Sequence, residues 1–141
     1  MTMWKVLVSL IFIIASSAYA SCFEDAAQRY SVPVDVLKAI SQVESGGDAK
    51  AINKANSDGS YDIGHMQINS SWLPRLAKYG IDERKLMDPC VNTHIGAWLL
   101  AENVYRMGMT WNAVGAYNAR SESKRLLYAR KVASVLGKIQ N

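Results

Sequence analysis

Residues 33–46 read PVDVLKAISQVESG, and the apolar side chains of this stretch recur at the spacing of a helix. Pro33 suits the first turn of such a helix, and the composition becomes polar and glycine-rich from Gly46. Glu44 therefore stands at the C-terminus of the helix, where the negative end of the helix dipole and apolar neighbours disfavour its ionised form. We expect the pKa of Glu44 to be raised.

A polar stretch at residues 61–70, YDIGHMQINS, places Asp62 18 residues after Glu44. Hydroxyls, amides and water in such a stretch can keep Asp62 charged. A neutral carboxyl group beside a carboxylate is an arrangement that protonates a glycosidic oxygen and stabilises the positive charge that develops on the sugar. Spacing alone also permits a plain alternative, with Glu44 a solvated residue at a helix end and Asp62 a turn former.

Helical spacing recurs through most of the remaining chain. Helices are predicted around residues 26–30, 71–79 and 91–107, after Thr110 and after Ser121. Between Gly46 and Ser60 the chain is rich in Gly, Asn, Asp, Ser and Lys, with Asp58-Gly59 as a tight-turn signal. The predicted fold is mainly α within an α+β class: a helical globule with a small irregular β-hairpin or loop insertion near residues 46–69.

The chain has 141 residues, half of them apolar, which is material for one domain with one core. Lys5, an apolar run over residues 6–15 and the small-x-small site Ala18-Tyr19-Ala20 predict a signal peptide at residues 1–20. The domain would then span residues 21–141. An uncleaved anchor is the alternative, although the run is short for a span of roughly 20 residues. A lipoprotein anchored at Cys22 is a third interpretation, but Tyr19 replaces the usual leucine.

Net charge favours no particular partner. Removal of Lys5 with the signal peptide lowers the formal charge from +4 to +3, which suits an anionic polymer such as a cell wall but equally an ordinary solvated surface. No basic run is interleaved with aromatic residues, so nucleic acid binding is not indicated, and no stable membrane span is expected after cleavage. Neither His65 nor His94 has a Cys or a second His at the sequence spacing typical of a metal site, so no metal site is predicted.

The two cysteines of an exported chain most simply form one disulfide, Cys22 to Cys90, which would tie the mature N-terminus to the start of the C-terminal helical half. Closing a loop of that length stabilises the fold by about 4 kcal/mol in the loop-entropy model. A pair of buried thiols is the alternative.

Three short motifs, Glu44-Ser45-Gly46, Gly64-His65-Met66-Gln67 and Ala116-Tyr117-Asn118, stand in the order seen in lytic transglycosylases of the soluble-transglycosylase, lysozyme-like family. The chain resembles that family over nearly its whole mature length. Its small size, signal peptide and cysteine pair resemble most the specialised enzymes of type III secretion, conjugation and type IV pilus systems. The resemblance implies a periplasmic or envelope enzyme that cleaves peptidoglycan without a metal or organic cofactor, and a secretion, conjugation or pilus machine as a further partner.

Carried over to this sequence, the resemblance makes Glu44 the general acid and base, with Ser45 orienting it or the sugar. Tyr117 and Asn118 correspond to the family's tyrosine motif near the acid, where a phenol can bind the carboxyl group and an amide can hold a sugar substituent. Arg120 stands where many members have glycine, so the rim beside Tyr117 is bulkier and charged.

The remaining substrate-binding candidates lie in the second motif and just after it. Met66 and Gln67 would line the glycan groove, Asn69 would join them, and Gly64 would let the backbone pass close beneath a polysaccharide. Structural roles remain open: Met66 and Tyr117 could be core residues, and Gln67 and Asn118 could cap backbone groups. The segment from Asp62 also resembles the aspartate-bearing strand of animal-type lysozymes.

Two mechanisms therefore remain open. In the second step, Glu44 can take a proton from the sugar's own 6-hydroxyl, which gives a 1,6-anhydro ring, or from water, which gives a reducing end as in lysozyme. Asp62 is expected to act through its charge. The alternatives of other classes are a non-catalytic glycan-binding scaffold of the same apparatus and a secreted antibacterial lysozyme.

Overall fold

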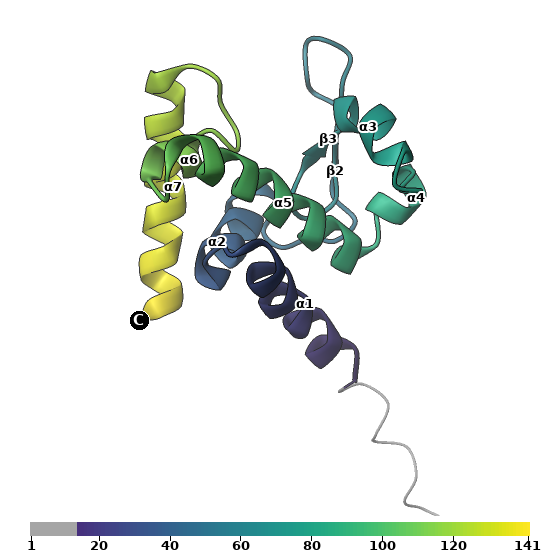
Figure 1. Cartoon of the computed structure of the whole chain (residues 1–141), viewed down its shortest axis with the longest axis horizontal. Helices are drawn as coiled ribbons and strands as arrows, with labels where there is room; N and C mark the ends of the chain where they lie inside the picture. The colour runs from purple at the N-terminus through teal and green to yellow at the C-terminus, as the bar shows by residue number, and fades with distance from the viewer. Residues whose placement is uncertain (1–13) are drawn as a thin grey trace, which may run out of the picture.

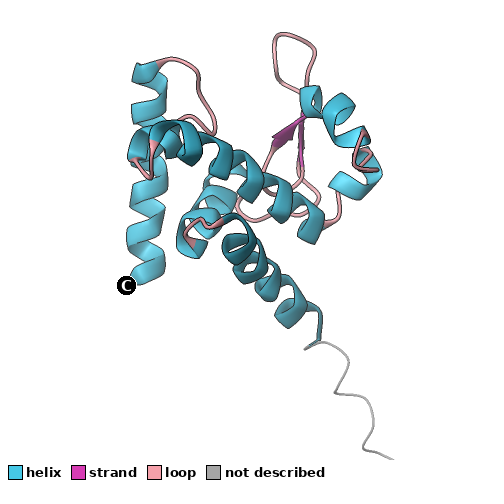
Figure 2. Cartoon of the chain, in the orientation of Figure 1, coloured by secondary structure: helices cyan, strands magenta, loops and turns pink. Residues whose placement is uncertain are grey.

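The computed structural model describes the backbone of residues 14–141 and the side chains of residues 22–141. Helices make up most of this part, and three two-residue strands form one small sheet (Figures 1 and 2). The elements are α1 Ile14–Tyr30, α2 Val34–Ser45, β1 Ile52–Asn53, β2 Asp62–Ile63, β3 Ile68–Asn69, the 3₁₀ turn η1 Ser70–Trp72, α3 Leu73–Ala77, α4 Glu83–Leu86, α5 Pro89–Met107, α6 Trp111–Gly115 and α7 Glu122–Gln140. The predicted class, mainly helical with a small β insertion, is confirmed.

Helix α5 crosses the middle of the molecule, with α6 and α7 at its C-terminal end and strands β2 and β3 above it in the view of Figure 1. α1 packs against α5 and α2, α2 packs against α7, and α6 packs against both α5 and α7. Their shared core holds fully buried side chains that include Leu37, Ile40, Leu100 and Val132. Burial of each such side chain stabilises the fold by about 1.5–3 kcal/mol, so the helices that carry the site are held by packing.

Local signals set most helix ends. Asp88 caps α5 by accepting a hydrogen bond from the backbone N–H three residues on, and α5 ends at Gly108 with a φ of +73°. Thr110 caps α6 in the same way as Asp88 caps α5. The end at Gly108 and the start after Thr110 were predicted from these residues. Ser121 takes the predicted N-cap position of α7, but its side chain makes no capping hydrogen bond.

The sheet is antiparallel in the order β1-β2-β3, and Asp62 in the central strand pairs with Asn53 on one side and Asn69 on the other. The predicted turn at Asp58-Gly59 lies in the loop between β1 and β2. The helix predicted over residues 71–79 is split into η1 and α3. Helix α4 was not predicted, because a single turn of four residues is too short to show a helical period.

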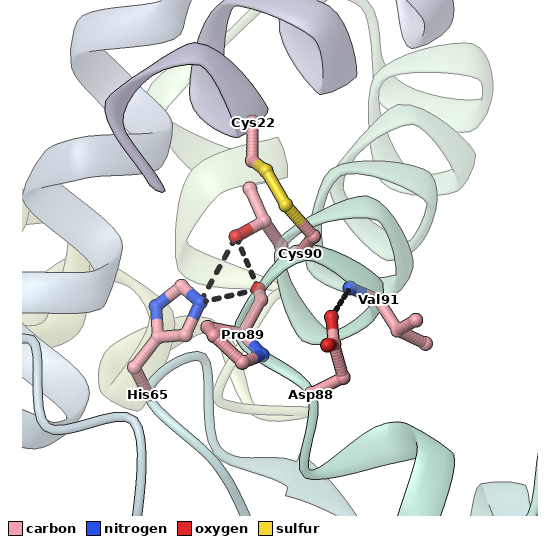
Figure 3. Close-up of a disulfide and its surroundings, with 7 residues drawn as sticks. Cys22, His65, Asp88, Pro89, Cys90 and Val91 are labelled. Carbon is pink, nitrogen blue, oxygen red and sulfur yellow. Dashed lines mark hydrogen bonds between the residues drawn. A yellow bond between two sulfur atoms is a disulfide. The ribbon is translucent and has the colours of Figure 1, made fainter. Parts of the chain in front are cut away.

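The predicted disulfide is confirmed: Cys22 of α1 is bonded to Cys90 in the first turn of α5, with 5.4 Å between the Cα atoms (Figure 3). The prediction of a signal peptide at residues 1–20 falls on residues 1–13, which lie outside the described part, and on backbone whose side chains are not described. Over residues 14–141, no helix combines the length and the apolar character needed to cross a membrane.

Candidate active site

Glu44 lies in the last turn of α2, where one face of the helix is buried and the other borders an open groove. Val36, Leu37 and Ile40 anchor the buried face. Gly46 stops the helix in the left-handed conformation, with a φ of +65°, and its N–H bonds back to the carbonyl of Gln42. The helix therefore ends directly after Glu44, as the sequence predicted, and leaves its carboxyl group half-buried at the groove.

The carboxyl group of Glu44 receives a hydrogen bond from the buried phenol of Tyr128, with 2.6 Å between Tyr128 Oη and Glu44 Oε1. Burial raises the pKa of Glu44, and the negative charge of Asp62 raises it further, against hydrogen bonds from Tyr128 and Asn118 that lower it. The predicted direction is confirmed. Burial and the neighbouring Glu44 also raise the pKa of Tyr128, so this phenol keeps its proton and acts as a donor.

Asp62 faces the same groove from β2, and side-chain amides satisfy both of its oxygens. Asn69 Nδ2 donates to Oδ1 over 2.9 Å, and Asn56 Nδ2 donates to Oδ2 over 3.2 Å. The antiparallel register places Asn69 directly opposite Asp62. Ser60 Oγ accepts a hydrogen bond from each of the same amides. The two carboxyl groups of the site thus differ as predicted, one against a phenol in partly buried surroundings and one in a polar network.

Hydrogen bonds to Asn92 of α5, whose side chain is fully buried, hold the turn between β2 and β3. Asn92 Oδ1 accepts from the N–H of Met66 over 2.8 Å, and its Nδ2 donates to the carbonyl oxygens of Ile63 and Leu86 over 3.0 Å each. Gly64 has a φ of +73°, and a Cβ there would lie closer than 3.0 Å to Asn92 Nδ2. Contact with α5 therefore requires glycine at this position, and the close approach of a polysaccharide stays a prediction.

Ser45 and His65 join the end of α2 to this turn. Ser45 Oγ donates to the carbonyl oxygen of His65 over 2.8 Å. The His65 ring is fully buried, with Nε2 3.2 Å from the carbonyl oxygen of Pro89 (Figure 3) and Nδ1 2.7 Å from Ser41 Oγ. Because a carbonyl can only accept, Nε2 carries the proton and Nδ1 accepts from Ser41. Burial lowers the pKa of His65, so the ring is neutral and structural.

Tyr117 reaches the same turn from the segment after α6. Its hydroxyl donates to the carbonyl oxygen of Met66 over 2.8 Å. The motif had implied a bond from this hydroxyl to Glu44 instead. Tyr117 lines the same groove as Glu44 and Asp62, and burial together with the charges of these two residues raises its pKa well above the usual value. Tyr128, which the motifs did not indicate, supplies the bond to Glu44 instead.

The groove has a volume of about 1110 Å³. Of the predicted site residues, it is lined by Glu44, Asp62, Gln67, Asn69, Tyr117 and Asn118. Ser45, Gly64 and Met66 are not part of its lining. The side chain of Met66 is fully buried against Gly96 of α5. It therefore belongs to the core, and the prediction that it lines the groove was wrong.

Two further residues that shape the candidate site, Tyr128 and Asn92, were not predicted from the sequence. Tyr128 shows only the apolar period of α7, and Asn92 is one polar residue in a long helix, so neither carries a local signal. No group of three or more His, Cys, Asp or Glu side chains within the described residues is arranged to hold a metal ion. What the groove offers is a partly buried acid, a second carboxylate and several hydrogen-bonding amides, which is a set suited to acid-base chemistry on a polar polymer.

Residues 21–131 match the family described as Transglycosylase SLT domain. Invasion protein IagB of Salmonella typhi is 41% identical over 122 residues, which is 83% of this chain and 76% of that protein. Protein IpgF of Shigella flexneri is 40% identical over 128 residues, which is 87% of this chain and 84% of that protein. A peptidoglycan-binding-like protein of Escherichia coli O157:H7 is 39% identical over 135 residues, which is 88% of this chain and 81% of that protein. With its fold, its groove and these relatives in agreement, the chain belongs to the transglycosylase SLT domain family.

Proposed function

We propose that this protein is a lytic transglycosylase that cleaves the β-1,4 bond between N-acetylmuramic acid and N-acetylglucosamine in peptidoglycan and leaves a 1,6-anhydro ring. The observation that carries this proposal is the state of Glu44. Its carboxyl group borders the groove, its pKa is raised by burial, and Tyr128 fixes one of its oxygens. A carboxyl group that keeps its proton to higher pH than an exposed glutamate suits the first step, which needs a proton donor.

The proposed reaction has two steps. The proton of Glu44 passes to the glycosidic oxygen, the bond from that oxygen to C1 of the muramic acid breaks, and N-acetylglucosamine leaves with a new hydroxyl group. The 6-hydroxyl of the same muramic acid then attacks C1 and gives its proton to the carboxylate of Glu44. The acid is thereby restored, and no water is consumed. Asp62, held by Asn56 and Asn69, would stabilise the oxocarbenium-like state between the steps.

A muramidase that transfers the sugar to water is the second candidate, and Asp62 is the observation that favours it. An aspartate on a strand beside the acid resembles the arrangement of animal-type lysozymes. Both reactions would use Glu44 in the same way, so only the product separates them.

The remaining part of the proposal concerns place and partners. The signal peptide predicted at residues 1–20 supports export to the periplasm or cell envelope. The resemblance to small enzymes of type III secretion, conjugation and type IV pilus systems, together with a relative named as an invasion protein, supports local opening of the wall for such an apparatus. The peptidoglycan-binding-like relative supports peptidoglycan as the ligand.

The test is mass spectrometry of the soluble products that residues 21–141, with the disulfide formed, release from purified peptidoglycan. Glu44→Gln is the blank, because the amide keeps the shape of the side chain but cannot donate a proton as an acid. Anhydro-muropeptides absent from the blank are the expected result. Products that carry one added water would instead make the protein a hydrolase.

Absence of any product would support the third interpretation, a scaffold that binds glycan without chemistry. Sedimentation of the same two proteins with cell walls separates that case from a misfolded preparation. Glu44→Gln is expected to bind walls as the unmodified protein does, since the proposed role of Glu44 is in the chemical steps.

A further inference from the structure

The two sides of the groove differ in charge. Four basic side chains line it on the side of α6 and α7: Arg106 at the end of α5, Arg120 in the loop before α7, and Lys124 and Arg125 in the first turns of α7. Two carboxylates of the lining lie near these residues, Glu102 on α5 and Glu44, which contacts Tyr128 of α7. The strands and the loop before β2 lie apart from α6 and α7 (Figure 1) and supply carboxylates, amides and hydroxyls, and Arg75 of α3 adds a fifth basic side chain to the lining on that side. We call the four basic residues the cationic wall.

None of the four residues of the cationic wall forms a salt bridge within the described part of the chain, where the one ion pair is Lys38 to Glu24. Arg106 Nη2 donates to the amide oxygen of Asn103 over 2.8 Å, and Arg125 Nε donates to the carbonyl oxygen of Ala119 over 3.0 Å. Both acceptors are uncharged, so these hydrogen bonds position the guanidinium groups without pairing their positive charge with a negative one. Arg120 and Lys124 are exposed.

The cationic wall begins close to the acid. Lys124 and Arg125 precede Tyr128 by four and three residues, so the three side chains share one face of α7. The hydroxyl of Tyr128 contacts Glu44, and one helical turn is about 5.4 Å long. A Cβ at Gly115 of α6 would lie closer than 3.0 Å to the carbonyl oxygen of Arg125, so close packing against α6 holds this turn of α7 in place. Groups attached to a sugar bound at Glu44 can therefore reach these cations.

Neutral sugar rings give such a wall little to bind, because hydroxyl and acetamido groups carry no charge. The anionic group of peptidoglycan is the lactyl ether of muramic acid, which ends in a carboxylate or, when substituted, in a peptide with several carboxylates. Arginine binds carboxylates through paired hydrogen bonds, and such charge-assisted bonds are about twice as strong as neutral ones. An acidic peptide on the muramic acid thus fits both the charge and the position of the wall.

We propose that the cationic wall binds the carboxylates of the peptide carried by muramic acid, so that the protein prefers peptide-bearing strands to peptide-free ones. This inference rests on the proposed function, because it assumes muramic acid at Glu44. The shared chemistry is a carboxylate, and its two sources are the peptide and the lactyl group of a peptide-free strand.

Binding in the Glu44→Gln background tests the proposal without turnover. Fluorescence anisotropy would compare three labelled soluble glycan strands: peptide-bearing, peptide-free after amidase treatment, and peptide-bearing with the carboxylates converted to amides. The variant pair Arg120→Ala/Lys124→Ala is matched by Arg130→Ala/Lys138→Ala, which removes the same charge from exposed positions of α7 outside the groove lining.

The Arg120→Ala/Lys124→Ala pair is expected to weaken binding of peptide-bearing strands about tenfold, which corresponds to about 1.4 kcal/mol, and to leave the other two strands nearly unchanged. The matched pair should change none of them. An equal loss of affinity for peptide-free strands would show that the wall binds the lactyl carboxylate. An equal loss of affinity in the matched pair would show that the effect comes from net charge alone. Either result, or no loss at all, overturns the proposal.

Turnover separates this inference from the proposed function. Anhydro products released equally well from peptide-bearing and peptide-free strands would keep the proposed function and overturn the peptide preference. If no strand yields products, the proposed function fails, and the binding comparison still decides whether the wall recognises the peptide.

Discussion

At the scale of single residues, the two carboxyl groups of the site are set apart by their surroundings. Glu44 is half-buried against a phenol, whereas side-chain amides bind both oxygens of Asp62. The proposed mechanism gives Asp62 a supporting role through its charge. Asp62→Asn should therefore lower turnover about 10- to 100-fold, while Glu44→Gln should lower it by about 10³-fold or more, because it removes the acid itself.

Rates of muropeptide release under identical conditions measure this difference. Asp48→Asn is the control, since Asp48 lies outside the groove lining and its bond to the Lys50 N–H can be kept by an amide. Equal and near-total losses in Asp62→Asn and Glu44→Gln would contradict a merely supporting aspartate and would indicate a nucleophile.

Tyr128 should tune the acid. Its hydrogen bond lowers the pKa of Glu44 against the effect of burial, so Tyr128→Phe should raise that pKa further. Since turnover requires the protonated acid, the alkaline limb of the pH-rate profile should move to higher pH, because the hydrogen bond that favours the charged carboxylate is lost. The profile of muropeptide release against pH measures the shift.

Tyr61→Phe is the matched control for Tyr128→Phe. It removes another phenol-carboxylate bond of 2.6 Å, from Tyr61 to Glu83, and neither residue lines the groove. An alkaline limb that stays in place in Tyr128→Phe, or one that moves equally in Tyr61→Phe, would mean that the bond to Glu44 does not set the acid's pKa.

At the scale of elements, the turn between β2 and β3 depends on its contact with α5. Gly64→Ala would place a Cβ against Asn92 Nδ2 in a left-handed conformation, and it would strain or break the bonds by which Asn92 holds the turn. We expect the free energy of unfolding to fall by about 3 kcal/mol or more, from the left-handed conformation and the buried polar groups that lose partners.

Urea unfolding measures this loss, and Gly137→Ala is its control. Gly137 lies in α7, where an added Cβ would meet no atom of a neighbouring element within 4 Å, so alanine there should stabilise the protein by about 0.5–1 kcal/mol. Similar small effects at both glycines would contradict the role described for Asn92.

At the scale of the whole molecule, the disulfide joins α1 to the helix that crosses the centre of the fold. It closes a loop with a sequence separation of 68 residues. The paired substitution Cys22→Ser/Cys90→Ser should lower the free energy of unfolding by about 4 kcal/mol, because the unfolded chain regains the entropy that the loop removes. Guanidinium unfolding of both proteins measures the change, with reductant added to the unmodified protein as a second route to the same state. A loss below about 1 kcal/mol would show that α1 is held by packing alone.

Local signals in the sequence determined much of this protein. Helical spacing, Pro33 and Thr110 as first-turn or cap residues, and Gly46 and Gly108 as ends depend on neighbours within one or two turns, so they could be read directly from the chain. The mainly helical class, the position of Glu44 at a helix end and the Cys22–Cys90 pairing followed from such signals and from the chemistry of an exported chain with two cysteines.

Only the tertiary structure decided which side chains meet. Tyr128 lies 84 residues from Glu44, and Asn92 is 26 residues from the backbone group of Met66 that it holds. Neither pairing produces a periodic pattern in the sequence, because it results from the packing of α7 against α2 and of α5 against the turn. The same packing placed Met66 in the core and gathered Arg106, Arg120, Lys124 and Arg125 along one groove. Side chains that are distant in sequence become neighbours through the burial of apolar faces, and that contact exists only once the chain has folded.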